Sequence, residues 1–459
     1  MANFDVVIVG AGPGGYPAAI RAAQLGASVA LIEKEAAGGT CLNWGCIPSK
    51  TLIATAEAYH RLRAIPGLHS CSPTLDYAAL VEHKNGVVKK LQSGVQQLLK
   101  ANGVRSISGT ASFTSRNRLA VTGSETIEAG HTILATGCTS LVPSFLPAHE
   151  RIVDSRAFLD RVDLPKRLII LGGGIIGCEF ACMAANLGAE VTIVEMLDDI
   201  LLTLDPEIRA TLRDHMEKAI GITVMTGAPL DEVSANNSCV QGNVGDKTIE
   251  GDLLIVAVGR APATGKLGLE HAGIATDESG FITVDDFGMT SAATVYAIGD
   301  VNGRTQLAHA ATSQGITVAE NIVRKERTRM ETLIPAAVFT SPEIGVVGLT
   351  EEEAAATGID VLTGKFAFAG LGKAIAVGET VGFVKWVADK ATDRLLGAHV
   401  IGAHATDLIA EAAVAIRSEL TLEEIGRTVH SHPTLSEAWM EAAHAAHGTA
   451  IHAPPSRGK

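Results

Sequence analysis

The sequence is poor in aromatic residues, in positive charge and in long apolar runs. Phe, Trp and Tyr make up 4% of the 459 residues, so a platform of aromatic side chains for nucleic acid is not expected. The net charge of −13 disfavours binding to nucleic acid and to anionic membranes. No apolar run reaches the roughly 18 residues that a membrane-spanning helix needs. Small molecules and other proteins remain as candidate partners.

Cysteine is scarce as well, and its distribution excludes a secreted scaffold. Seven cysteines, an odd number, are scattered along the chain, which is not the framework of a small disulfide-rich protein. The chain enters a predicted strand by Phe4, so we expect no signal or transit peptide. We therefore expect a cytoplasmic protein, in which a disulfide is more often catalytic than structural.

An internal repeat organises the chain. A 30-residue pattern begins at Val6 and returns at Leu168, and each copy predicts a strand, a glycine turn, a helix and a second strand ending in glutamate. This is the βαβ fingerprint of dinucleotide binding, in which glycines let the backbone approach a pyrophosphate and the acid binds a ribose hydroxyl. Two copies predict two dinucleotides, with FAD and NAD(P) as the candidates. The fingerprint residues are Gly10, Gly12, Gly15 and Glu33, then Gly172, Gly174, Gly177 and Glu195.

Three further apolar segments predict late strands of the dinucleotide-binding domains. Segments 131–137 and 252–260 carry Gly137 and Gly259 after their apolar runs, and segment 294–300 ends in Asp300. A carboxylate at the carboxyl end of a strand lies where α/β folds bind ligands. We interpret Asp300 as a ligand of the flavin ribityl chain; the alternative is an aspartate that caps a turn.

Cys41 and Cys46 form the most informative pair. Zinc sites use tighter pairs and two further ligands, and no second pair of this kind is present. A structural disulfide is the other alternative, but the position directly after a flavin-type fingerprint favours a redox disulfide. The helix predicted to follow, with Pro48 near its start, would lower a nearby thiol pKa through its dipole. A short loop between the cysteines would let one sulfur face a flavin and the other a substrate.

Lys50 lies one turn into that helix. Beside a flavin its charge would stabilise an electron-rich reduced ring, whereas the plain alternative is a solvated helix lysine. Such a lysine needs a buried counterion, and Glu179 within an apolar run is the candidate. The other cysteines lack redox spacing, and we expect the i,i+4 pair among them, Cys178 and Cys182, to be small buried residues. These other cysteines are Cys71, Cys138, Cys178, Cys182 and Cys239.

A candidate general base lies near the C-terminus. His432 is followed by Pro433, which can hold a turn, and Glu437 follows in a predicted Ala-rich helix. A carboxylate that accepts the imidazole Nδ1–H fixes the tautomer and leaves the other nitrogen free to take a thiol proton. The alternatives are His430, His444 and His447.

These motifs, in this order, resemble those of the pyridine nucleotide–disulfide oxidoreductase family over nearly all 459 residues. The resemblance implies an α/β fold with two dinucleotide-binding (Rossmann-like) domains plus a C-terminal α+β interface domain. It implies residues 1–145 as the first part of an FAD-binding domain and 146–266 as an NAD-binding domain. It also implies 267–336 as the part that completes the FAD-binding region and 337–459 as the dimerisation domain.

The resemblance also assigns roles to the matching residues. Cys41 would be the interchange thiol that attacks the substrate, and Cys46 would face the flavin. His432, held by Glu437, would be the acid/base, supplied by the other subunit of a homodimer. Lys50 and Glu179 would form an ion pair near the flavin.

The expected cofactors are FAD and NAD, and no metal site is expected. The expected FAD contacts are Gly10, Gly12, Gly14, Gly15, Glu33, Lys50, Gly137, Asp300 and Ala308. The expected NAD contacts are Gly172, Gly174, Gly177, Glu195 and Gly259. Two departures from the family pattern are Pro17 in the first helix and Cys138 where serine is usual.

Within the family, the sequence favours members that oxidise protein-bound dihydrolipoamide with NAD⁺. The strand that ends at Glu195 has no nearby arginine to bind a 2′-phosphate, and no cysteine follows Cys239. The partners then implied are lipoyl domains or the E2 component of 2-oxo acid dehydrogenase complexes, or the lipoyl protein of glycine cleavage. An NADPH-driven disulfide reductase and a non-catalytic flavoprotein scaffold are the alternatives.

Overall fold

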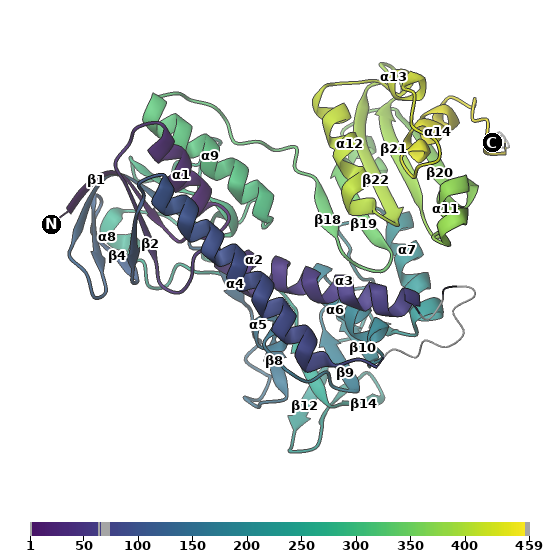
Figure 1. The fold of residues 1–459 in the computed structure, drawn as a ribbon, viewed down its shortest axis with the longest axis horizontal. Coiled ribbons are helices and arrows are strands. Elements are labelled where there is room, and N and C mark those ends of the chain that lie inside the picture. Colours follow the sequence, from purple (N-terminus) through teal and green to yellow (C-terminus); the bar gives the residue numbers. More distant parts are fainter. Residues whose placement is uncertain (1, 63–64, 66–73, 455–459) are drawn as a thin grey trace.

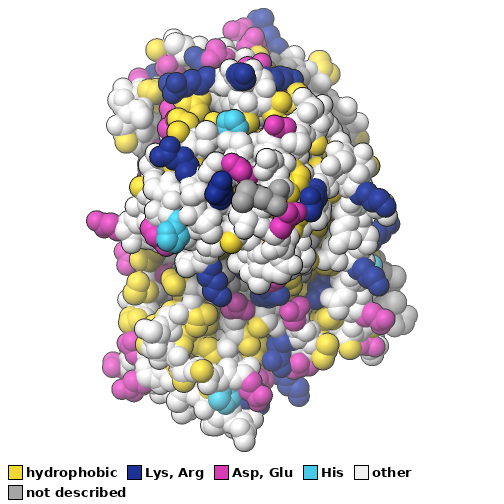
Figure 2. Space-filling model, turned by 90° about the vertical axis from the view of Figure 1, so that its left-hand side faces the viewer, with side chains coloured by type: hydrophobic (Ala, Val, Ile, Leu, Met, Phe, Trp, Pro, Cys, Tyr) yellow, Lys and Arg dark blue, Asp and Glu magenta, His cyan; other side chains and the backbone are white. Residues whose placement is uncertain are grey.

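The computed structural model describes residues 2–62, 65 and 74–454. Two largely parallel sheets flanked by helices are followed along the chain by a C-terminal antiparallel sheet (Figure 1). This mixed α/β arrangement confirms the expected fold class. Within the described residues, no helix has the length and apolar character to cross a membrane. On the face in Figure 2, Lys and Arg side chains are interspersed with Asp and Glu rather than gathered into one basic patch.

The first sheet is built around β1 (Ala2–Val9), whose residues 6–9 are almost completely buried. Strand β1 pairs in parallel with β2 (Val29–Glu33) and with β6 (Ile127–Leu134), as expected for strands covered on both faces. Strand β17 (Val295–Ala297) then joins β6 in parallel, although the second sheet lies between them in the sequence. The other elements of this region are β3 (Arg105–Ser108), β4 (Ala111–Ser115), β5 (Arg118–Val121) and α8 (Leu269–Ala272).

Two helices from distant parts of the chain cross closely beside this sheet. Helix α1 (Gly15–Gln24) packs against α9 (Ala308–Arg324). A Cβ on Gly315 would overlap the Gly14 carbonyl oxygen, so glycine is needed at this crossing. The close packing ties α9, and the strand β17 before it, to the first glycine turn.

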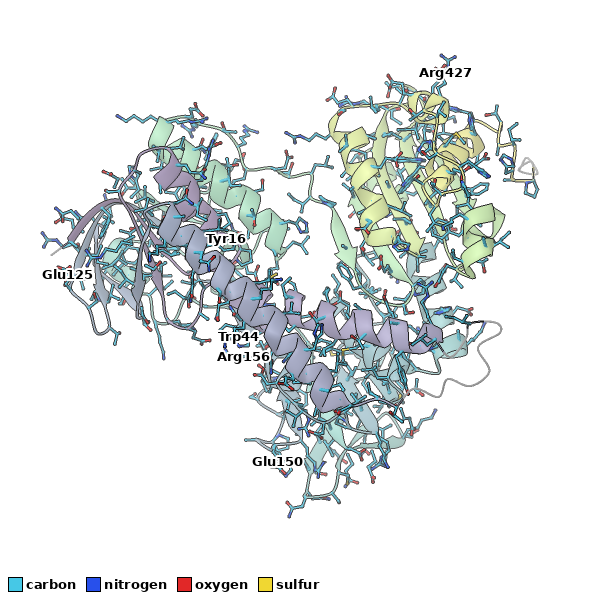
Figure 3. The ribbon with its side chains drawn as sticks, in the orientation of Figure 1. Tyr16, Trp44, Glu125, Glu150, Arg156 and Arg427 are labelled. Atoms are coloured by element: carbon cyan, nitrogen blue, oxygen red, sulfur yellow. The ribbon has the colours of Figure 1, made fainter. Side chains whose placement is uncertain are left out.

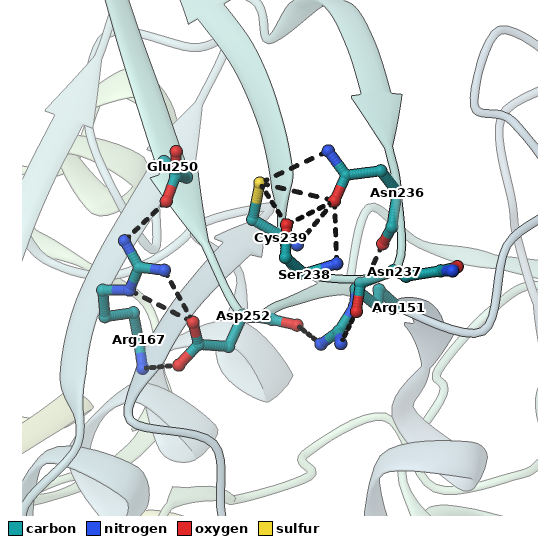
Figure 4. Close-up of polar contacts among 8 residues, drawn as sticks. All are labelled: Arg151, Arg167, Asn236, Asn237, Ser238, Cys239, Glu250 and Asp252. Carbon is teal, nitrogen blue, oxygen red and sulfur yellow. Dashed lines mark hydrogen bonds and ion pairs between the residues drawn. The ribbon is translucent and has the colours of Figure 1, made fainter.

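The second sheet repeats the pattern of the first. Its order is β11-β10-β9-β15-β8, and all four pairings are parallel. Arg167 at the start of β9 binds Asp252 and Glu250, which anchors a three-stranded antiparallel sheet to this region (Figure 4). The elements are β8 (Ile152–Asp154), α5 (Ser155–Leu159), β9 (Arg167–Leu171), α6 (Ile175–Asn186), β10 (Glu190–Glu195), α7 (Pro206–His215), β11 (Thr223–Thr226), β12 (Asp231–Ala235), β13 (Val240–Val244), β14 (Lys247–Gly251) and β15 (Leu253–Val256).

The C-terminal region is an antiparallel sheet in the order β18-β19-β22-β21-β20. At its core the Trp386 and Trp439 rings lie 4.6 Å apart, and the Trp386 indole N–H donates to the Trp439 carbonyl. The elements are β18 (Ala336–Val338), β19 (Glu343–Gly348), α10 (Glu351–Ala356), β20 (Val361–Ala367), α11 (Gly372–Val377), β21 (Phe383–Asp389), β22 (Leu395–Gly402), α12 (Ala405–Arg417), α13 (Leu422–Arg427) and α14 (Glu437–Ala446).

The C-terminal region also packs on the rest of its own chain. One hydrophobic cluster contains residues of α3 (Cys46–Leu62) and α6 together with Val338, Ile344 and Phe383. Beside it, the buried Lys385 lies 3.0 Å from Asp205, which caps the N-terminus of α7. The expected domain boundaries, at residues 145, 266 and 336, remain a prediction.

Candidate active site

The first glycine turn is shaped by two close backbone contacts. Gly10 has a φ of +102°, and a Cβ there would overlap the Ala135 carbonyl oxygen. A Cβ on Gly15 would overlap the Gly10 carbonyl oxygen. Glu33, at the end of β2, accepts a hydrogen bond of 2.7 Å from the Ala11 N–H. The turn, the helix and the strand-end acid therefore form one hydrogen-bonded unit.

The second glycine turn has the same geometry. Gly172 has a φ of +111°, and a Cβ on Gly177 would overlap the Gly172 carbonyl oxygen. Glu195 accepts a hydrogen bond of 2.7 Å from the Gly173 N–H and one of 2.9 Å from the Leu197 N–H. The repeat found in the sequence is thus a repeat of individual hydrogen bonds.

Both turns fit the phosphates of a dinucleotide. A Cβ on Gly174 would meet no atom within 4 Å, so the backbone before α6 faces open space. In the first region the hydroxyl of Thr136 is buried without a hydrogen-bond partner among the described residues, and it lies beside the Gly10 turn. An open helix N-terminus suits an anion, and an unsatisfied buried hydroxyl calls for a polar ligand. Gly14 is packed more tightly, because a Cβ there would press on Ile298 and on the Ala311 carbonyl oxygen, and its expected contact with FAD stays a prediction.

Asp300 lies just beyond β17, at the carboxyl edge of the first sheet. Burial raises the pKa of its carboxyl group, and the charge of Arg260, 3.6 Å away, opposes that rise. Arg260 directly follows Gly259 and was not predicted from the sequence as part of this site. A basic residue at the end of an apolar strand was the available signal. Ala308 is the first residue of α9 and lies in the same region as Asp300.

The cysteine pair lies at a break between two helices. The prediction of a short loop between the two cysteines is therefore wrong. Cys41 is inside α2 (Gly39–Trp44), whereas α3 begins at Cys46 itself. The break falls at Gly45, where a Cβ would lie 3.1 Å from the Thr40 carbonyl oxygen. The structure describes Cys41 and Cys46 as free thiols, each partly buried. Helical geometry, rather than loop freedom, fixes the two sulfurs.

The two thiols differ in acidity. A hydrogen bond from the Cys41 thiol and, to a smaller extent, the charge of Lys50 outweigh the effect of burial and together lower the pKa of Cys46 to about 7. The same hydrogen bond and burial raise the pKa of Cys41 well above its usual range. In the reduced protein the negative charge therefore resides on Cys46. An asymmetric redox pair requires one sulfur that stays a thiolate and a second sulfur that stays protonated.

Lys50 and Glu179 form an ion pair. The Lys50 Nζ lies 2.7 Å from Glu179 Oε2, and the Glu179 side chain is only 4% exposed. The other Glu179 oxygen accepts a hydrogen bond of 2.9 Å from the Phe339 N–H, and the Phe339 ring lies 4.7 Å from the Lys50 Nζ. Phe339 belongs to the C-terminal region and was not predicted from the sequence, because no local pattern marks a contact 160 residues away.

His432 and Glu437 form a second pair. The imidazole Nδ1 lies 2.8 Å from Glu437 Oε1, and the Thr434 N–H donates to the other carboxylate oxygen. Burial works to raise the pKa of Glu437, but these two hydrogen bonds outweigh it and hold the pKa below its usual value. The His432 side chain is 75% exposed, and within the described part of the chain it hydrogen-bonds only to Glu437. The alternative His430 is engaged with Glu411 at 2.7 Å.

The helix break carries one further contact that sequence reasoning missed. The Arg156 guanidinium lies 3.8 Å from the centre of the Trp44 ring and also binds Glu35 at 3.0 Å (Figure 3). Arg156 is in α5, so this contact joins the second region to the cysteine-bearing helices.

The other cysteines have ordinary surroundings. Cys178 and Cys182 are buried as expected. Cys138 is buried next to Asp300, and burial raises its pKa to about 11. Cys239 lies in a turn, where its backbone N–H donates a hydrogen bond to the side-chain oxygen of Asn236 (Figure 4). Cys71 lies outside the described residues.

Comparison with known proteins identifies the family. Residues 4–315 match the model of the pyridine nucleotide-disulphide oxidoreductases, and residues 334–443 match the dimerisation domain of the same proteins. The chain belongs to this family. It is therefore an oxidoreductase, as the sequence resemblance predicted, and it carries the family's dimerisation domain.

Relatives in this family match over nearly their whole length. Dihydrolipoyl dehydrogenase from Chlamydia pneumoniae is 42% identical, with 99% of both chains covered. Dihydrolipoyl dehydrogenase from Thermus scotoductus is 43% identical, with 98% of this chain and 99% of that protein covered. Among solved structures, the HOCl-induced flavoprotein disulfide reductase RclA from Escherichia coli superposes with a TM-score of 0.88 at 30% identity, covering 96% of this chain and 99% of that one.

Proposed function

We propose that this family member is an FAD-containing dihydrolipoyl dehydrogenase, which oxidises protein-bound dihydrolipoamide to lipoamide and reduces NAD⁺ to NADH. The observation that carries the proposal is the asymmetric pair of Cys41 and Cys46 at the helix break, with Lys50 beside the more acidic sulfur. Full-length relatives that carry this enzyme name at 40–43% identity support the choice of substrate.

The two glycine turns would hold the two dinucleotides. The turn at Gly10 and Gly12, with Glu33, Gly137, Asp300 and Ala308, would hold FAD. The turn at Gly172 and Gly174, with Gly177, Glu195 and Gly259, would hold NAD. The carboxylate of Glu195, fixed by two backbone N–H groups, favours a free ribose hydroxyl over a 2′-phosphate.

The dithiol reaction begins with a proton transfer. Neutral His432, oriented by Glu437, takes a proton from one substrate thiol at its free nitrogen. The substrate thiolate attacks Cys41 Sγ of the Cys41–Cys46 disulfide, a substrate–Cys41 disulfide forms, and Cys46 leaves as a thiolate. The positive charge of Lys50 stabilises that leaving group.

The second substrate thiol then completes the exchange. The sulfur of this second thiol attacks the substrate sulfur that is bonded to Cys41. Its proton passes to Cys41, which leaves as a thiol. The substrate departs as a cyclic disulfide, two electrons remain on the cysteine pair, and one proton remains on His432. FAD held at the first glycine turn would supply the redox chemistry that carries these two electrons and the Cys41 proton to NAD⁺ as a hydride, and the second proton would leave from His432.

We further propose that the active form is a homodimer in which His432 serves the cysteine pair of the partner subunit. His432 is exposed on its own chain, and large apolar side chains are exposed in the same region. Val429 is 93% exposed and Ile451 is 78% exposed, as expected for a surface that a second subunit covers. Lipoyl domains of 2-oxo acid dehydrogenase complexes or of the glycine cleavage system would deliver the substrate. A cytoplasmic location stays a prediction.

A coenzyme-resolved assay tests this function. Purified protein with bound FAD is given dihydrolipoamide with either NAD⁺ or NADP⁺, and NADH or NADPH formation is followed. We expect rapid turnover with NAD⁺ and at least tenfold lower kcat/KM with NADP⁺. Reduction of disulfides by NADPH without dihydrolipoamide oxidation would instead identify a disulfide reductase. A flavin that dihydrolipoamide cannot reduce would identify a non-catalytic scaffold.

A further inference from the structure

We infer that Phe339, in the dimerisation domain, is a positioning residue that holds Lys50 in place beside the redox-active cysteines of its own chain. The inference rests on the role proposed above for Lys50 and Glu179. It gives the dimerisation domain a second task, performed within one chain and separate from the supply of His432 to a partner.

Phe339 contacts both members of the ion pair at once. Its backbone N–H donates to one Glu179 oxygen at 2.9 Å, while the other oxygen binds the Lys50 Nζ at 2.7 Å. Its ring lies 4.7 Å from the same Nζ, within the range of a cation–π interaction. One residue therefore orients the acid through its backbone and restrains the ammonium through its side chain.

The contact depends on how the dimerisation domain packs against α3 and α6. Phe339 directly follows β18, and its neighbours Val338 and Ile344 are fully buried in the cluster shared with those helices. The docking of β18 and β19 on the helices places the Phe339 ring beside Lys50. The sequence near Phe339 predicts a strand, but it does not predict that the Phe339 ring lies beside Lys50.

The position of Lys50 has chemical consequences at the nearest thiol. Cys46 responds to the Cys41 thiol, to Lys50 and to Glu179, and Lys50 acts to lower its pKa. The Lys50 side chain is 29% exposed, so water competes for the ammonium. Removing the ring would let Lys50 move toward water, and its average effect on Cys46 and on a nearby reduced flavin would weaken.

The experiment measures the ionisation of Cys46 in the FAD-loaded enzyme. A thiolate in contact with oxidised flavin gives a long-wavelength absorbance, which is titrated with pH in the two-electron-reduced enzyme. For Phe339→Leu we expect the midpoint to rise by about 0.5–1 pH unit. The midpoint potential of the bound flavin should become more negative. For Phe339→Tyr, which keeps the ring and the backbone N–H, we expect both values to be unchanged.

Two further variants serve as controls for the effect of Phe339→Leu. Phe287 is a matched control, because the Arg327 guanidinium lies 4.3 Å from its ring in another part of the chain, and Phe287→Leu should leave both values unchanged. Lys50→Met should move the Cys46 midpoint upward at least as far as Phe339→Leu does. If Phe339→Leu does not fold, Phe339→Met replaces it under the same criteria.

The outcomes separate this inference from the proposed function. If Phe339→Leu titrates as the unmodified enzyme does while Lys50→Met shifts, the inference is overturned and the role of Lys50 stands. A lower melting temperature with an unchanged titration has the same meaning, because Phe339 is then only structural. If Lys50→Met leaves the titration unchanged, the proposed role of Lys50 fails and the inference fails with it.

Discussion

The Nδ1 atom of His432 lies 2.8 Å from Glu437 Oε1, although the histidine side chain is 75% exposed and the glutamate only 17% exposed. A partly buried acid thus orients an exposed base. We predict that His432→Ala lowers kcat for dihydrolipoamide about 10²–10⁴-fold, with FAD content unchanged. His447→Ala is the matched control, because His447 also pairs with a carboxylate, Asp393, at 2.8 Å. Equal losses in both variants would contradict the assignment of the base.

The proposed sharing of the active site between two subunits predicts complementation between two inactive variants. Cys41→Ser and His432→Ala homodimers should each be nearly inactive. A heterodimer of the two contains one site with both lesions and one with neither, so co-expressed and isolated heterodimers should recover up to half of the normal activity. Heterodimers that keep FAD but remain inactive would show that His432 acts within its own chain.

The acidity of Cys46 predicts a pH dependence. Its pKa is lowered to about 7 from an ordinary value near 9, so the thiolate is retained between these pH values. The long-wavelength absorbance of the reduced enzyme should therefore be strong at pH 8 and should disappear as the pH falls through about 7. The thiolate's contribution to stability is fully present above pH 9 and is lost over the same fall. An absorbance that disappears near pH 9 would contradict the assignment of the acidic sulfur.

Glu195 predicts the coenzyme preference. We expect Glu195→Arg to lower kcat/KM for NAD⁺ and to raise it for NADP⁺, each by about tenfold to a hundredfold, because a cation replaces a carboxylate at the ribose. Steady-state kinetics with both coenzymes give the measurement. Glu190→Arg, at the opposite end of the same strand, controls for the change in charge. An unmodified protein that already prefers NADP⁺ would refute the assignment.

The ion pair of Lys385 and Asp205 predicts a large effect on stability. The Lys385 side chain is 5% exposed and that of Asp205 is 1% exposed, so Lys385→Met leaves a buried carboxylate without its cation. We expect a loss of about 3–5 kcal/mol in the free energy of unfolding. In the control Lys390→Met, an exposed pair with Asp360 is broken, and the loss should be below about 1 kcal/mol. Chemical denaturation of both variants gives the comparison.

Sequence patterns predicted those parts of the site whose geometry is local. The glycines of both turns and the acids Glu33 and Glu195 lie within 30-residue units, so spacing alone defines them. The acid–base pair of His432 and Glu437 is local in the same sense. The roles of these residues stay predictions until the variants are measured.

Most of the contacts that were missed join distant segments, although the ion pair of Lys50 and Glu179, 129 residues apart, was predicted from an acid within an apolar run. Phe339 reaches Glu179 and Arg260 reaches Asp300 only because segments far apart in the sequence pack together. The helix break at Gly45 was missed for a different reason, since a six-residue helix gives no readable periodicity. The proposed pairing of His432 with the cysteines of a partner subunit involves a second chain, and it stays a prediction.

The late arrival of β17 has a consequence during protein synthesis. Residues 132–134 of β6 present an open strand edge until β17, residues 295–297, leaves the ribosome. The strands of the second parallel sheet, which end at Val256, emerge before that moment. A nascent chain therefore holds a complete second dinucleotide domain beside an incomplete first one for several seconds at ordinary elongation rates. During that interval the open edge of β6 is a template on which a strand of another chain can pair.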